Sequence, residues 1–242
     1  MSSAASSAVT LRHARSRGEQ FDARFYEKSV HHFPIAEAAA VFADRTDWPA
    51  PEDYVLAFRG RAAPVRFEGV APRKRRRRAK PPVDPESMYD ASIVRGVVPT
   101  RARCWHDYLN ALVWATFPRA KEALHARQYA MMRAWATPGA TELPNARTRE
   151  QDAVALVDEG GIVVFRTTDK GQAELAVPFG HALFEGLVYE TPSMIARAIP
   201  VAVAELPSSR SIAIALADEA LAKLLREPQP LLPEMLPRHA LR

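Results

Sequence analysis

The sequence has very little cysteine: Cys104 is the single one among 242 residues. A disulfide within the chain is therefore excluded, as is a zinc site assembled from several thiolates. Glycine is also scarce, with 10 residues against 20 prolines, and the sequence has neither a glycine-rich phosphate loop nor a dinucleotide-binding fingerprint. No uncharged apolar run approaches the ~20 residues that cross a bilayer, so we expect no membrane span.

Excess positive charge is confined to one short segment. The chain has a net charge of +5, from 33 Lys and Arg against 28 Asp and Glu. Seven of the basic side chains lie within eight positions: Arg73, Lys74, Arg75, Arg76, Arg77, Arg78 and Lys80. The other 26 basic residues are outnumbered by the 28 acidic ones, so a basic protein body is excluded. The segment has almost no large apolar side chain to bury, which predicts an exposed basic loop over residues 71–85.

Two interpretations of this basic loop stay open. Its cations would attract nucleic acid through the phosphates, with a steep dependence on salt concentration. The segment has no aromatic residue on which a base could stack, so it is not expected to read a nucleotide sequence. The other interpretation is a solvated insertion that has no partner.

The remaining composition is typical of a folded domain, with 48% apolar and 25% charged residues. Residues 1–18 are rich in Ser and Ala and lack the apolar core of a secretion signal, so we predict a disordered tail and a cytoplasmic location. We expect a single globular domain over residues 19–226, followed by a Pro-rich C-terminal tail over residues 227–242.

The apolar patterning predicts an α+β fold, a mainly helical single domain with a small antiparallel β-hairpin or sheet. Helices are expected over residues 53–58, 100–117, 119–136, 180–189 and 211–226, with shorter helical pieces between 21 and 42. Strands are expected over residues 64–70 and 199–206, and a hairpin over residues 153–165, closed by a Gly-Gly turn. Thr148 and Gln151 form a capping-box pattern just before that hairpin.

Six short motifs occur in a fixed order along the chain. They are Gly96-Val-Val-Pro-Thr-Arg101, Trp105-His-Asp-x-x-Asn110-Ala-Leu-Val-Trp114, Phe117-Pro-Arg-x-Lys121, Arg147-Thr-Arg149-x-x-Asp152-Ala, Asp158-Glu-x-Gly161 and Gly180-His-Ala-Leu-x-Glu185. In these motifs the sequence resembles a bacterial family of uncharacterised proteins, domain-of-unknown-function family 3025. The resemblance covers residues 44–60 and 88–226, and it implies membership without assigning an activity.

A polar trio interrupts the apolar face of the first long predicted helix. On a helix, His106 and Asn110 are i,i+4 neighbours, and Asp107 and Asn110 are i,i+3 neighbours. In a later helix, His181 and Glu185 are again i,i+4 neighbours. Two helices that each offer an imidazole and a carboxylate could bind a divalent metal at His106 and His181, since these ligands suit zinc, iron or manganese. They could equally form an acid–base pair in which Asp107 or Glu185 orients an imidazole.

Arginines lie near both polar groups. Arg101 precedes the first group, and Arg147 and Arg149 precede Asp152. Guanidinium groups bind carboxylate or phosphate bidentately, so these three arginines are expected to bind an anionic small molecule. Ion pairs of Arg149 with Asp152, or of Arg147 with Glu185, would engage them instead.

The sequence therefore predicts a small enzyme or ligand-binding protein for an anionic small molecule. The predicted catalytic residues are His106, Asp107, Asn110, Asp152, His181 and Glu185, and the predicted substrate-binding residues are Arg101, Arg147 and Arg149. One alternative is a nucleic-acid-associated accessory protein that uses the basic loop. Another is a structural or interaction protein in which the polar network only stabilises the fold. The enzyme hypothesis fails if His106 and His181 lie more than ~10 Å apart.

Overall fold

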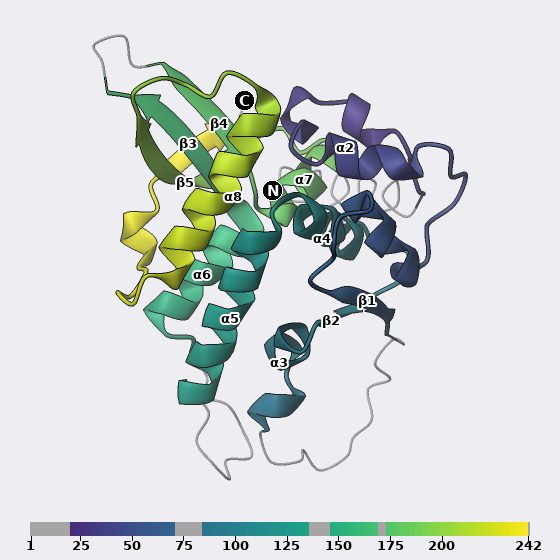
Figure 1. Ribbon diagram of the computed structural model, residues 1–242, viewed down its shortest axis with the longest axis horizontal. Helices are drawn as coiled ribbons and strands as arrows, with labels where there is room; N and C mark the ends of the chain where they lie inside the picture. Colours follow the sequence, from purple (N-terminus) through teal and green to yellow (C-terminus); the bar gives the residue numbers. More distant parts are fainter. Residues whose placement is uncertain (1–19, 71–83, 136–145, 169–172, 242) are drawn as a thin grey trace, which may run out of the picture.

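The computed structural model describes residues 20–70, 84–135, 146–168 and 173–241 (Figure 1). Its α-helices are α2 (Ala36–Ala39), α3 (Tyr89–Val94), α4 (Trp105–Thr116), α5 (Pro118–Trp135), α6 (Arg149–Gly160), α7 (His181–Val188) and α8 (Arg210–Arg226). Short 3₁₀ helices are η1 (Phe25–Glu27), η2 (Val30–His32), η3 (Ala40–Phe42), η4 (Pro51–Phe58), η5 (Pro85–Ser87) and η6 (Pro233–Met235). The strands are β1 (Arg66–Gly69), β2 (Val97–Thr100), β3 (Gly161–Thr167), β4 (Glu174–Pro178), β5 (Met194–Val203) and β6 (Arg238–Leu241). The prediction of a mainly helical α+β fold is confirmed.

The strands of the described residues form two small sheets. β1 and β2 pair in parallel, with Arg66 opposite Val97. The larger sheet has the order β4-β3-β5-β6. In it, β3 pairs antiparallel with β4 and parallel with β5, and β5 pairs antiparallel with β6, so the sheet is mixed. The first five residues of β3 are all buried, as expected for an inner strand that is covered on both faces.

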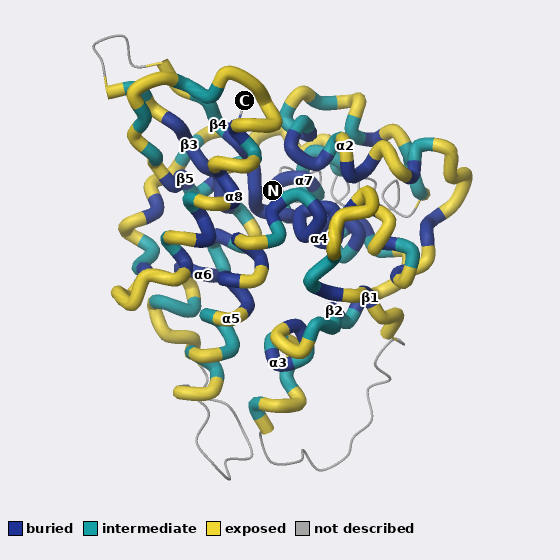
Figure 2. Tube along the Cα trace, viewed as in Figure 1, coloured by how far each residue is buried: buried dark blue, intermediate teal, exposed yellow. Residues whose placement is uncertain are grey.

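Helix α4 lies at the centre of the described structure, and nine of its 12 residues are buried (Figure 2). Its first turn packs among aromatic rings: the ring centroids of Trp48 and Trp105 are 4.9 Å apart, and those of Trp105 and Tyr108 are 5.9 Å apart. His106 and Asp107 stay half-buried because they lie on the part of this turn that leaves the core. Dense packing of the rest of the helix fixes where these two polar side chains stand.

The β-hairpin predicted over residues 153–165 is wrong. Helix α6 continues to Gly160, and strand β3 begins at Gly161, the next residue. A Cβ atom at Gly161 would lie 2.5 Å from the carbonyl oxygen of Val157, so glycine permits this abrupt change from helix to strand. The capping box at Thr148, which the sequence does predict, is present and starts this helix.

The other predicted elements are found, some of them with shifted ends. The helices expected over residues 119–136, 180–189 and 211–226 are α5, α7 and α8. Helix α4 begins at Trp105 and not near residue 100, because Thr100 still belongs to strand β2. The later predicted strand is β5, which begins and ends earlier in the chain than the sequence indicated.

The C-terminal stretch, predicted as a Pro-rich tail, packs against the fold in its described part. Leu231 and Leu236 are buried, and β6 pairs with β5. The leucines between the prolines thus contribute to the apolar core, which the proline content did not indicate. The predicted tail at residues 1–18, and residues 71–83 of the predicted basic loop, lie outside the described residues.

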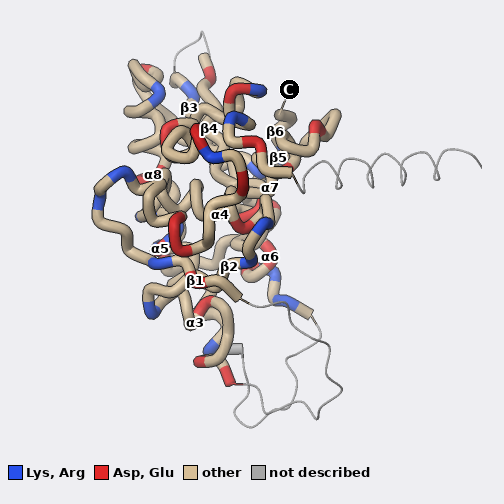
Figure 3. Tube along the Cα trace, turned by 90° about the vertical axis from the view of Figure 1, so that its right-hand side faces the viewer, with Lys and Arg blue, Asp and Glu red and all other residues tan. Residues whose placement is uncertain are grey.

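Charged residues of both signs are distributed along the described chain (Figure 3). Many of them form exposed ion pairs, such as Arg45 with Asp53 and Arg103 with Asp47, which add little stability each. Of the helices that the structure describes, none has the length and apolar character needed to cross a bilayer.

Candidate functional site

A pocket of about 510 Å³ lies where the β1–β2 sheet meets helices α3, α4, α6 and α7. Its wall is formed by Val70, Tyr89, Pro99, Arg101, His106, Asp107, Asn110, Asp158, Glu159 and His181. Five of these ten residues, namely Arg101, His106, Asp107, Asn110 and His181, are among the site residues that the sequence predicts. The fold therefore brings the predicted polar groups of two separate helices into one pocket.

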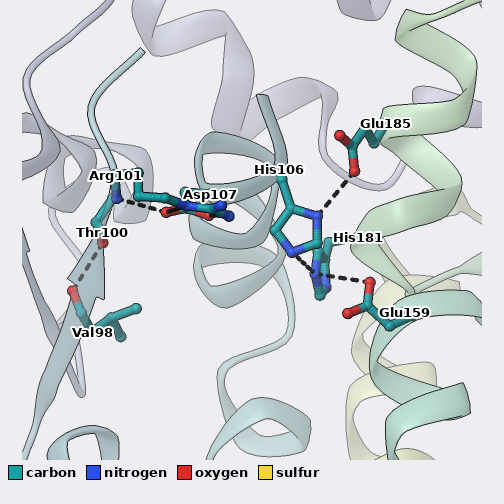
Figure 4. Close-up of polar contacts among 8 residues, drawn as sticks. All are labelled: Val98, Thr100, Arg101, His106, Asp107, Glu159, His181 and Glu185. Carbon is teal, nitrogen blue, oxygen red and sulfur yellow. Dashed lines mark hydrogen bonds and ion pairs between the residues drawn. The ribbon is translucent and has the colours of Figure 1, made fainter. Parts of the chain in front are cut away.

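The two histidines meet at the wall of this pocket. The Nε2 atoms of His106 and His181 lie 3.0 Å apart, although 75 residues separate them in the sequence. Their rings meet edge to face, with centroids 4.3 Å apart (Figure 4). Gly180 permits α7 to begin close against the end of α6, because a Cβ there would lie 2.5 Å from the carbonyl carbon and oxygen of Glu159 and would push α7 away.

Glu185 orients the first histidine. Its Oε2 lies 2.9 Å from Nδ1 of His106, across the contact between α4 and α7 (Figure 4). This hydrogen bond is the main reason why the pKa of His106 is raised above its ordinary value, against the opposing effect of burial. The His106 side chain keeps 32% of its surface exposed, so the imidazole can reach a molecule in the pocket.

His181 is more deeply placed, with 3% of its surface exposed. Its Nε2 lies 3.3 Å from Oε2 of Glu159, and its Nδ1 lies 3.7 Å from Oδ1 of Asp158. Asp158 also accepts a 2.6 Å hydrogen bond from Nζ of Lys121, whose side chain is fully buried. Burial alone would raise the pKa of Asp158, but the positive charge of Lys121 and the nearby His181 imidazole hold it well below its usual range.

Asp107 forms a second ion pair at the wall, on the opposite side of His106 from Glu185 (Figure 4). Its Oδ2 accepts hydrogen bonds from the backbone N and from Nε of Arg101, at 2.6 and 3.1 Å. Its Oδ1 accepts another from Nη2 of Arg101, at 2.6 Å. Asp107 therefore holds Arg101 at the pocket and does not contact the His106 ring. Of the two residues predicted to orient an imidazole, Asp107 and Glu185, only Glu185 bonds His106.

The remaining predicted residues lie elsewhere. Arg149 pairs with Glu234 at 2.6 Å, and Arg147 and Asp152 are exposed and do not line the pocket. The predicted three-arginine anion site is thus not assembled, since only Arg101 reaches the wall. The predicted nucleic-acid residues Arg73–Lys80 lie outside the described residues.

Asp158, Glu159 and Tyr89 also line the pocket wall, although they are not among the predicted site residues. The first two were noted in the Asp158-Glu-x-Gly161 motif, but the hairpin interpretation placed them in a solvated turn. The helical spacing of the buried Ala153, Val154 and Val157 was the signal that could have placed them at the end of a helix beside the pocket.

Three side chains of the pocket could hold a metal ion. Ligand atoms of His106, Glu159 and His181 all lie within 4.8 Å of one another. Two imidazoles and a carboxylate are a ligand set that suits zinc and other divalent transition metals.

Fold and site together define an α+β protein with a pocket built from histidines and carboxylates. Residues 78–176 match the family described as "Protein of unknown function (DUF3025)", which is the family that the motifs resemble. The matched range includes His106 and Glu159, whereas His181 and Glu185 follow it. No curated protein and no solved structure matched the chain.

Proposed function

We propose that the protein is an enzyme that binds a small polar molecule in this pocket, with the His106–His181 pair as its reaction centre. The observation that carries the proposal is the 3.0 Å contact of the two Nε2 atoms at the wall of a pocket large enough for a small molecule. Imidazoles held by carboxylates and open to a pocket are suited to proton transfer or to activation of water.

A histidine that only stabilises the fold has a different environment in this same chain. His125 is 2% exposed, stacks on Trp114 with ring centroids 5.5 Å apart, and bonds Asp90 through Nδ1 at 3.0 Å. It does not line the pocket. His106 differs because its Nε2 faces another imidazole at an open wall, an arrangement that packing does not require.

The charge of the ligand is a separate question, because the sequence predicts an anion. Among the wall residues and their ion-pair partners, two cations face four carboxylates: Arg101 and Lys121 against Asp107, Asp158, Glu159 and Glu185. An anion would therefore need a bound cation beside it.

Asn110 is the group that we propose for recognition of the ligand. Its side-chain oxygen is buried and has no hydrogen-bond partner among the described residues, although the side chain lines the pocket. A buried amide oxygen without a hydrogen-bond partner is unfavourable, and a bound ligand with a donor group can supply that partner. This supports a ligand with polar groups that can reach Asn110.

The test uses the purified full-length protein with His106→Gln and His181→Gln variants. A panel of small esters, amides and phosphoesters is screened for turnover and for binding by thermal shift. We expect at least one class to be turned over by the wild type and to lose about 100-fold in rate in both variants. An Arg149→Ala variant is the control, because Arg149 pairs with Glu234 away from the pocket. Turnover or binding that both histidine variants retain would contradict the proposal.

A further inference from the structure

We infer that the pocket binds one divalent transition-metal ion, zinc by preference, through Nε2 of His106, Nε2 of His181 and a carboxylate oxygen of Glu159. This metal site lies in the same pocket as the proposed reaction centre. The inference rests on the proposed function because both require His106 and His181 to act there. Four features of the described residues support it: the lone pairs, the distances, the charges and the groups that hold the ligands.

The first feature is a convergence of lone pairs. The 2.9 Å contact with Glu185 favours the His106 tautomer in which Nδ1 carries the hydrogen and donates it to the carboxylate. This tautomer leaves a lone pair on Nε2. The carboxylate of Asp158 near Nδ1 of His181 favours the same tautomer there. Two nitrogen lone pairs then face each other at 3.0 Å, with an oxygen of Glu159 3.3 Å from one of them. Three acceptors this close repel one another unless a proton or a metal cation lies among them, and a metal cation can engage all three at once.

The second feature is the spacing of these atoms. Zinc bonds to histidine nitrogen and carboxylate oxygen are about 2.0–2.2 Å long, and tetrahedral geometry then separates neighbouring ligand atoms by about 3.3 Å. The two observed separations, 3.0 and 3.3 Å, are close to this value. Little movement of the side chains is needed to complete the coordination.

The third feature is charge. With both histidines neutral, the wall residues and their ion-pair partners have two negative charges in excess. A divalent cation neutralises this excess. It would also allow an anionic small molecule to bind at the pocket, which the protein side chains alone do not favour.

The fourth feature is the set of groups that hold the ligands. Metal-binding histidines donate their other ring N–H to a carboxylate or carbonyl, which fixes the ring and makes the ligating nitrogen more basic. Glu185 does this for His106. Nδ1 of His181 is buried without a hydrogen-bond partner among the described residues, and the carboxylate nearest to it is that of Asp158, 3.7 Å away and held by Lys121, so a small shift would let Asp158 accept its hydrogen. The two α6 carboxylates therefore have separate tasks: Glu159 as a ligand and Asp158 as a positioning residue.

The chemistry that such an ion supplies is activation of water and polarisation of a carbonyl or phosphoryl group. The pocket beside the ligands has room for a small substrate. Esters, amides and phosphoesters are therefore the substrate classes that the inference favours.

The experiment measures metal directly in the full-length protein. Protein stripped with a chelator is titrated with Zn²⁺ by calorimetry, and with Co²⁺ by visible absorption, which reports tetrahedral nitrogen and oxygen ligation. We expect one ion per chain. Glu159→Gln should weaken zinc binding by about 100-fold, and Glu185→Gln by about 10–100-fold. The Glu159 side chain is 50% exposed, so loss of folding is not a concern in that variant.

Two matched controls isolate the site. Glu174→Gln changes a carboxylate that pairs with Arg166 on the sheet, and His239→Gln changes an imidazole on β6; neither residue lines the pocket. Both should bind zinc as the wild type does. Absence of stoichiometric zinc in the wild type overturns the inference, as does zinc binding that persists in Glu159→Gln and His106→Gln.

The outcomes also separate the inference from the proposed function. If the wild type binds no metal but turns over a substrate in a manner that depends on His106, the inference fails and the pair acts in proton transfer. If stoichiometric zinc binds through these residues but no small molecule does, the inference stands and the proposed enzyme function fails.

Discussion

Nζ of Lys121 donates a 2.6 Å hydrogen bond to Oδ1 of Asp158, and the lysine side chain is completely buried. The same ammonium lies 5.7 Å from the ring centroid of Trp114. A buried lysine is unfavourable unless its charge is paired, so removal of either partner leaves an unpaired buried charge that destabilises the protein. It ties α5 to the end of α6, directly behind the pocket wall.

Lys121→Met should destabilise the protein by about 3–5 kcal/mol, because it leaves the charge of Asp158 largely buried and unpaired. The measurement is the free energy of unfolding from urea titration. The double variant Lys121→Met with Asp158→Asn removes both charges and should recover most of this loss. A single variant that loses less than about 1 kcal/mol would show that the ion pair does not hold the structure.

Asn110→Leu should separate stability from function. The replacement has a similar volume and removes an amide whose oxygen is buried without a partner among the described residues, so the free energy of unfolding should stay equal or rise by about 1 kcal/mol. Ligand binding in the pocket should be lost in the same variant. If thermal unfolding instead shows a clear destabilisation, the amide has a structural partner and is not reserved for a ligand.

The sequence predicts where the side chains of the candidate site lie on their own helices. His106 lies on a strongly apolar helix, and His181 and Glu185 share one face of a short one, so local periodicity alone places them. That the two faces meet could not be derived, because it depends on tertiary packing of α7, which approaches the end of α6 closely at Gly180. The prediction that they share a site was a hypothesis from residue chemistry, and the geometry agrees with it.

The two main failures of the sequence predictions, the hairpin and the anion site, have separate physical causes. Residues 153–165 contain the end of a helix and a buried inner strand, and their apolar side chains fall into two short runs, 153–157 and 162–165, on either side of Asp158-Glu-Gly-Gly161. Two short apolar runs around a polar Gly-Gly segment are typical of a hairpin, and runs this short do not distinguish helix from strand, so Glu159 was assigned to a turn. Arg149 was assigned to an anion site because its partner, Glu234, lies 85 residues away in a stretch predicted as a tail.

The pH dependence of stability should show the burial of His32. Its side chain is 1% exposed and packs against the rings of Phe25 and Phe184, and burial lowers its pKa to about 4. The unfolded chain, with an ordinary pKa of 6.5, binds this proton more readily, so stability falls as the pH falls from 6.5 to 4. The loss from this one group is at most about 3 kcal/mol.

His32→Leu tests this by comparison, because carboxylates titrate in the same range. The free energy of unfolding of both proteins is measured between pH 7 and pH 4, and the variant should lose less stability on acidification than the wild type. His239→Gln is the matched control and should keep the wild-type slope, since His239 is not buried in the core. Equal slopes for His32→Leu and the wild type would mean that His32 takes up its proton in the folded state as readily as in water.

Gly180→Ala should disturb the site through packing alone. The backbone at Gly180 has φ −60°, which alanine adopts freely, so strain in the dihedral angle is not the cause. The new Cβ would meet the carbonyl of Glu159 at 2.5 Å and force α7 away from α6. We expect a loss of about 1–3 kcal/mol in stability, together with weaker zinc binding, because His181 moves away from Glu159.

Gly160→Ala is the control for this effect, one residue from the same contact. A Cβ at Gly160 would meet nothing within 4 Å, and the residue ends helix α6, so alanine there should be neutral or stabilise by about 0.5–1 kcal/mol. Zinc affinity should then be unchanged. If Gly180→Ala and Gly160→Ala behave alike in thermal unfolding and in zinc titration, the close approach at Gly180 does not position His181. The meeting of the two histidines would then depend on the α4–α7 contact alone.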